Sequence, residues 1–180
     1  MYSIIITIII IIIVIVNQYI YYDTNNLIKY HFISSNKPKI VILGSLHGNE
    51  SSGSYAIQQI HNELKTNKLM LKQGELLLFP FVNKYGGYLN YRYVPSINKK
   101  VDLNRIWYYN KKSDYSLVED LKEIIKDADL VIDCHEGWGY HISNPRSMGS
   151  CLFCTHEHLV SLCDNTVKKL NNHIKNPKKL

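Results

Sequence analysis

Short continuous apolar runs alternate along the chain with longer segments in which apolar residues recur every three or four positions. Three of the runs are typical of strands buried in a sheet, and they cover Lys39–Leu43, Glu75–Val82 and Leu130–Cys134. The periodic segments predict helices over residues 53–66, 116–127 and 156–174. Strands that alternate with helices predict an α/β fold with a mostly parallel or mixed central sheet flanked by helices.

Local signals refine two of the connecting segments. Ser116 is followed three residues later by Glu119, the capping-box pattern that marks the start of a helix. The segment from 83 to 98 contains two adjacent glycines and many tyrosines, and we predict that it is irregular. Residues 23–37 are polar and mixed, which predicts a linker with room for one edge strand, followed by the main domain over residues 38–180.

The first 22 residues are far more apolar than the rest of the chain. Residues 4–16 (IIITIIIIIIVIV) carry no charge and are shorter than the roughly 20 residues that span a bilayer, but the apolar character resumes as far as Tyr22. We interpret residues 1–22 as a hydrophobic anchor or uncleaved signal that attaches the protein to a membrane through residues 4–22, on a side that the sequence leaves open. The alternatives are the apolar part of a cleaved signal peptide and a buried strand, because most of these residues are β-branched.

Composition narrows the class of partner. The chain has 180 residues and a net charge of +6, and only three of its 21 basic residues are arginine. Without an arginine cluster or a basic block, the charge argues against nucleic-acid binding. Four cysteines include a lone CxxC at Cys151–Cys154, which is a weak metal signal; separate thiols are the favoured interpretation, and a disulfide remains open.

Candidate chemistry lies directly after the predicted strands. His47 and Glu50 share a glycine-bounded turn after the first strand, and His135 follows the third. Ligands of an open α/β sheet bind beyond the carboxyl ends of its strands, so we expect these side chains to meet. Two imidazoles and one carboxylate form the three-ligand zinc site of hydrolytic enzymes, which predicts one zinc ion here. Asp102 or Asp133 is placed to hold the second nitrogen of a ligand imidazole. If the three ligands do not converge, the zinc hypothesis fails.

Three motifs together carry a resemblance to a known family: GxxHGNE over residues 44–50, DLNR over 102–105 and DxHEG over 133–137. In this order they resemble the zinc carboxypeptidase superfamily, and most closely its succinylglutamate desuccinylase/aspartoacylase branch, across about residues 38–150. The resemblance implies a zinc-carboxypeptidase-like fold. It also implies a hydrolase that cleaves an amide bond adjacent to a free carboxylate, in an N-acyl amino acid or at a peptide C-terminus.

The resemblance also implies roles for individual residues. The zinc ligands would be His47, Glu50 and His135. Asn104 and Arg105 would bind the carboxylate of a small substrate or peptide C-terminus, and Arg92 would stabilise the oxyanion formed from the scissile carbonyl.

The family's general base is a glutamate on a later strand. This chain ends 45 residues after His135, so we expect the domain to be incomplete at its C-terminus. Glu157 and Glu136 are then the candidates for proton transfer. If neither serves, the alternative is a non-catalytic, membrane-tethered protein that binds zinc or a carboxylate.

Overall fold

The computed structural model describes residue 27 and residues 29–94, 100–107, 115–137, 145–146 and 151–173. The chain divides into two compact units, residues 1–136 and 137–180, and each is described by itself. The predicted membrane anchor over residues 4–22 lies outside the described residues. No helix in the described ranges is long and apolar enough to cross a membrane.

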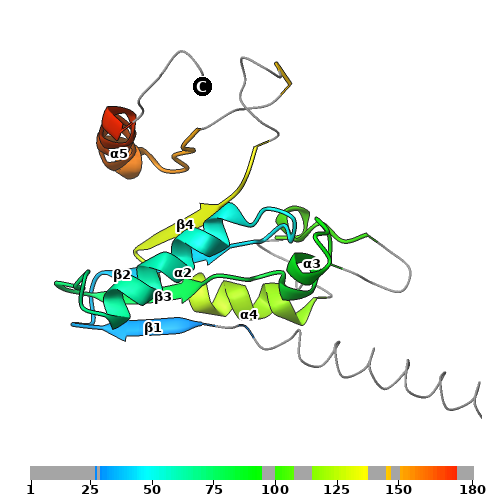
Figure 1. Cartoon of the computed structure of the whole chain (residues 1–180), viewed down its shortest axis with the longest axis horizontal. Coiled ribbons are helices and arrows are strands. Elements are labelled where there is room, and N and C mark those ends of the chain that lie inside the picture. Colours follow the sequence, from blue (N-terminus) through cyan, green and yellow to red (C-terminus); the bar gives the residue numbers. More distant parts are fainter. Residues whose placement is uncertain are drawn as a thin grey trace, which may run out of the picture. The chain divides into compact units, whose positions relative to one another are not determined.

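The first unit is built on a four-stranded mixed sheet with the strand order β1-β3-β2-β4 (Figure 1). Its strands are β1 (Tyr30–Ile33), β2 (Lys39–Gly44), β3 (Glu75–Phe79) and β4 (Leu130–Cys134). Strand β2 pairs in parallel with both β3 and β4, whereas β1 is antiparallel to β3. This is the predicted mixed sheet, and β1 is the edge strand for which the segment over residues 23–37 has room.

Alternate side chains of the central strands pack against two different helices. Val41, Leu43, Leu77 and Phe79 belong to one core cluster, which contains Val118 and Leu121 of α4 (Ser116–Ile125). Their neighbours Leu76 and Leu78 belong to a second cluster with Ile57 and Leu64 of α2 (Ser52–Lys65). Successive residues of a strand point to opposite faces, so α2 covers one face of the sheet and α4 the other.

Two predicted boundaries differ from the structure. Tyr115, with extended backbone angles, is the N-cap of α4 and Ser116 is already its first helical residue, so the predicted capping box does not form. Strand β3 ends at Phe79 because Pro80 has no N–H to donate to the ladder. The segment predicted as irregular contains a short helix, α3 (Lys84–Tyr88).

Strand β4 is the one predicted buried strand that is not buried. It pairs with β2 along one edge and is the last strand of the described sheet. Val131 and Ile132 are each 39% exposed, although they point to opposite faces. An apolar run predicts a strand, but its position within the sheet decides whether both faces are covered.

The described part of the second unit contains two helical elements. A 3-10 turn, η2 (Glu157–Leu159), precedes α5 (Val160–His173), in place of the single helix predicted over residues 156–174. No residue of α5 is buried within the structure. All four cysteines are free thiols.

Candidate metal centre

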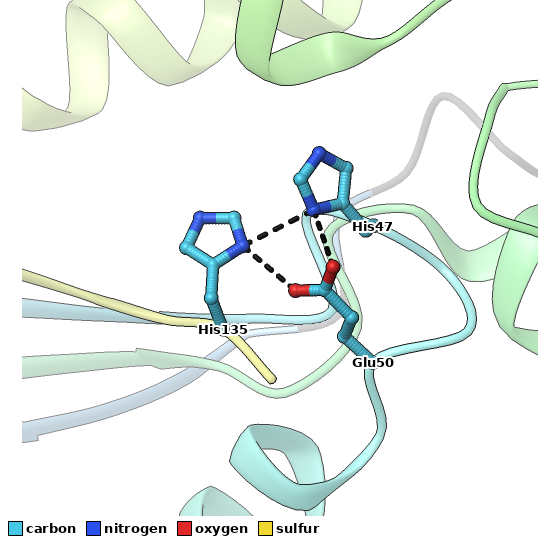
Figure 2. Close-up of side chains that lie close together, drawn as sticks. All are labelled: His47, Glu50 and His135. Atoms are coloured by element: carbon cyan, nitrogen blue, oxygen red, sulfur yellow. Dashed lines mark hydrogen bonds and ion pairs between the residues drawn. The ribbon is translucent and has the colours of Figure 1, made fainter. Parts of the chain in front are cut away.

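Two histidines and a glutamate meet beyond the carboxyl ends of β2 and β4 (Figure 2). Nδ1 of His47 lies 2.8 Å from Oε1 of Glu50, and Nδ1 of His135 lies 2.8 Å from Oε2 of the same carboxylate. The two Nδ1 atoms are 3.1 Å apart. One ligand atom from each residue falls within 4.8 Å of the others, so the structure brings together all three predicted zinc ligands.

The turn after β2 has the tight geometry needed to present two of these side chains. Ser45 has a φ of 50°, in the left-handed region that reverses the chain at the end of the strand. Its buried hydroxyl lies 3.0 Å from the Glu50 carbonyl oxygen and 2.6 Å from the hydroxyl of Ser54 on α2. This serine pair, which was not predicted from the sequence, ties the turn to the helix behind it.

Glycine is required where the turn meets α3. A Cβ on Gly48 would lie 2.1 Å from the carbonyl carbon of Gly86, far inside van der Waals contact. The backbone N–H of Gly48 also donates to the carbonyl of Arg92 at 3.3 Å. The turn that carries His47 is therefore packed directly against backbone, with no room for any side chain at Gly48.

Each histidine is held through its second nitrogen by an aspartate. Nε2 of His47 donates to Oδ1 of Asp102 at 3.0 Å, and Nε2 of His135 donates to Oδ2 of Asp133 at 2.8 Å. A carboxylate is an acceptor, so both Nε2 atoms carry hydrogen and both Nδ1 atoms are directed at the shared centre. The sequence offered either aspartate for this role, and the structure uses both.

Asp102 reaches His47 because its neighbours fix the DLNR segment in the core. Leu103 is 1% exposed and belongs to the same core cluster as Leu43 and Phe79. An isolated β-bridge joins Val101, directly before Asp102, to Val94. Asp102 then caps the 3-10 turn η1 (Leu103–Arg105) by accepting from the backbone N–H of Asn104 at 2.9 Å.

Arg92 lies against the same cluster. Its Nη1 donates to Oε1 of Glu50 at 2.8 Å, and its Nη2 lies 3.4 Å from Oδ2 of Asp102. The guanidinium thus bridges the two carboxylates that contact His47. Asn83 helps to place this arginine, because its side-chain amide donates to the Arg92 carbonyl at 3.3 Å. This role of Asn83 was not predicted from the sequence.

The hydrogen bonds within the cluster lower the pKa of Glu50 and raise the pKa of His135. Burial raises the pKa of Glu50, but hydrogen bonds from His135, His47 and the backbone N–H of Glu136 outweigh it and hold the pKa far below its ordinary value. Hydrogen bonds to Asp133 and then to Glu50 raise the pKa of His135 to about 9. In the metal-free protein at neutral pH, Glu50 is therefore a carboxylate and His135 an imidazolium.

This donor set fits a zinc ion. Imidazole nitrogen and carboxylate oxygen are zinc ligands, and three protein ligands leave a position free. Carboxylates behind metal-binding imidazoles are the usual means of fixing their orientation, and both are present here. The proton on Nδ1 of His135 occupies the position of a metal ligand bond, so it must leave when a metal binds.

Four predicted site residues remain: Asn104, Arg105, Glu136 and Glu157. Asn104 is half-buried and Arg105 is exposed; Arg105 Nη1 donates to the Asn104 carbonyl at 3.0 Å. Glu136 directs its carboxylate to the backbone N–H of Ser52 at the start of α2. Glu157 is exposed at the start of η2 in the second unit, and its predicted role stays a prediction.

Comparison with known proteins agrees with the motifs. The family model of the succinylglutamate desuccinylase/aspartoacylase catalytic domain matches residues 36–161, and this confirms the resemblance. No curated protein matches the chain significantly.

Several solved structures share its fold. A succinylglutamate desuccinylase/aspartoacylase from Rhodobacter sphaeroides is 23% identical, with a TM-score of 0.50, over 61% of this chain and 33% of its own. The tripeptide-bound cell shape determinant protein Csd4 from Helicobacter pylori is 20% identical, with a TM-score of 0.63, over 84% of this chain and 40% of its own. The matched part of the present chain thus covers well under half the length of either protein.

Proposed function

Because the chain belongs to the succinylglutamate desuccinylase/aspartoacylase catalytic-domain family, we propose that it is a zinc-dependent hydrolase of amide bonds adjacent to a free carboxylate. Its substrates would be N-acyl amino acids or peptides with a free C-terminus. The observation that carries this proposal is the convergence of His47, Glu50 and His135, with an aspartate behind each imidazole. Zinc bound there would supply Lewis-acid activation of water and of the scissile carbonyl.

The chain's own residues would orient and polarise the substrate. The hydrogen bond from Arg92 to Glu50 holds the positively charged guanidinium beside the cluster. A positive charge in this position suits stabilisation of a developing oxyanion. Arg105 is exposed on η1, and its planar guanidinium suits bidentate binding of a substrate carboxylate, with Asn104 beside it. One of the similar structures, Csd4, has a tripeptide bound, which supports a carboxylate-bearing peptide as one substrate class.

The test has a binding part and a turnover part. Zinc titration against a competing chelator should show one site in the wild-type chain, with about 100-fold or greater loss in His47→Ala and His135→Ala. N-acyl amino acids and dipeptides should then be hydrolysed with zinc and not with excess chelator. Absence of stoichiometric zinc binding by the wild-type chain would rule the proposal out.

A second candidate function, non-catalytic binding of zinc or a carboxylate, is favoured by the position of Glu136. This acid next to a predicted ligand has its carboxylate on the N–H of Ser52, and so does not offer a general base to the cluster. Under this alternative the chain binds zinc but does not hydrolyse any of these substrates. Glu157→Gln discriminates further: it abolishes turnover if Glu157 transfers the proton, while zinc binding is retained.

A further inference from the structure

The end of β4 and the start of α2 are tied together by a single residue, Glu136. Its backbone N–H donates to Oε2 of Glu50 at 3.0 Å. Its side-chain carboxylate accepts from the backbone N–H of Ser52. Glu136 directly follows His135, and Ser52 is two residues after Glu50. Both bonds therefore connect the segment that carries one candidate ligand to the segment that carries another.

Helix α2 needs an acceptor at its N-terminus. The first N–H groups of a helix have no partner within it and carry a partial positive charge. The N-cap residue, Ser51, makes no side-chain cap hydrogen bond, and the first turn of α2 contains no acidic residue. The carboxylate of Glu136 supplies both the acceptor and the negative charge from a distant part of the sequence.

The packing at this junction leaves little freedom for the two segments to separate or slide. A Cβ on Gly53 would lie 2.4 Å from Cβ of Cys134, so the first turn of α2 lies directly on the end of β4. Only glycine at position 53 permits this approach. With Gly53 against Cys134 and Ser52 bonded to Glu136, the spacing between the two ligand-bearing segments is fixed on both sides.

We infer that Glu136 is a positioning residue that sets the geometry of the metal site by joining the His135 segment to α2 and to the Glu50 carboxylate. The inference rests on the proposed function, in which Glu50 and His135 bind zinc. Glu136 acts through these two residues and does not itself contact the metal. Partners of metal ligands typically contribute 10-fold to 100-fold to metal affinity, and we expect Glu136 to fall in this range.

The test compares three variants of the full chain with the wild type. Glu136→Ala removes the carboxylate, whereas Glu136→Gln keeps an oxygen that can accept from Ser52. Asp129→Ala is the matched control, because Asp129 also accepts from a backbone N–H, that of Lys39 at 2.7 Å, at the opposite end of the β2–β4 pair. Zinc affinity, the visible spectrum of the Co²⁺-loaded protein and the thermal midpoint are measured for each.

The expected result is a zinc affinity about 10-fold to 100-fold weaker in Glu136→Ala, a smaller loss in Glu136→Gln, and a change within about twofold in Asp129→Ala. Both alanine variants should lower the thermal midpoint. The Co²⁺ spectrum should change in Glu136→Ala and stay as in the wild type in Asp129→Ala. Equal affinity of Glu136→Ala and wild type, or an equal loss in Asp129→Ala, overturns the inference alone. A wild-type chain that takes up no zinc overturns the proposed function and this inference with it.

Discussion

Nε2 of His47 donates to Oδ1 of Asp102 at 3.0 Å, although 55 positions separate the two residues in the sequence. The same aspartate caps η1 and contacts Arg92, so it couples the histidine turn to the DLNR segment. A hydrogen bond on Nε2 commits Nδ1 to the shared centre. Asp102 therefore decides which nitrogen of His47 a metal can meet.

Removal of Asp102 should weaken zinc binding without abolishing it. In Asp102→Ala we expect a loss of about 10-fold to 100-fold in zinc affinity, because the imidazole loses its fixed orientation. Asp102→Asn retains an acceptor oxygen for Nε2 and should lose less. Zinc affinity is measured by chelator competition. Wild-type affinity in the alanine variant would contradict the orienting role.

Zinc binding should strengthen as the pH rises toward 9. The pKa of His135 in the metal-free protein is raised to about 9 by Asp133 and Glu50, so one proton must leave before Nδ1 can bind a metal. The apparent association constant is expected to increase about tenfold per pH unit between pH 7 and 8.5 and to flatten above about pH 9.

Asp133→Ala provides the control for this pH dependence. The hydrogen bond to Asp133 is the largest cause of the raised pKa of His135, so its removal lowers that pKa. The plateau in zinc affinity should then begin at a lower pH than in the wild type. A wild-type affinity that does not change between pH 7 and 8.5 would show that no such proton is displaced.

The metal-free protein should lose stability as the pH rises through the range in which His135 loses its proton. The pKa of His135 is raised in the folded state, so the protonated ring stabilises the fold fully below its unfolded pKa of about 6.5, and this contribution is lost as the pH rises through about 9. The side chain is 32% exposed, and with solvent screening we expect a loss of about 1 kcal/mol. Urea unfolding with chelator present at pH 6 and pH 9.5 measures it, and His135→Ala should show little of this difference.

Two glycines that approach each other should tolerate a methyl group very differently. In Gly48→Ala the new Cβ meets Gly86 backbone at 2.1 Å, so the turn must move; we expect destabilisation of about 2 kcal/mol and weaker zinc binding. In Gly87→Ala the atom nearest to the new Cβ is Cδ1 of Phe81 at 3.7 Å, an ordinary van der Waals contact, and we expect stability equal to or slightly above wild type. Thermal unfolding of both variants checks this, and similar midpoints would contradict the close packing.

Arg105 should affect substrate and not metal. Its side chain is exposed and makes no contact with His47, Glu50 or His135 among the hydrogen bonds and ion pairs of the described residues. With an N-acyl amino acid we expect Arg105→Ala to lower kcat/KM by about 10-fold to 100-fold, because a charged hydrogen bond contributes about 1.5–3 kcal/mol. Zinc affinity should stay at the wild-type value. A fall in zinc affinity instead would assign Arg105 to the metal site.

The sequence by itself determined the α/β class, the parallel strands and the three residues most suited to bind a metal. These inferences depend on local pattern: apolar runs such as Lys39–Leu43 require burial in a sheet, and residues directly after parallel strands share one edge of it. His47 and Glu50 are also close in sequence, so a tight turn is enough to bring them together.

Only the tertiary structure decided the contacts that depend on packing between distant segments. The exposure of β4 follows from its place at the end of the sheet formed by the described residues, and the capping of α2 by Glu136 crosses 84 positions of sequence. Likewise, Asp102 reaches His47 only because Leu103 is buried in the core. Periodicity records which side chains need burial, but it does not record which neighbour provides it, and that choice sets the geometry of the candidate metal centre.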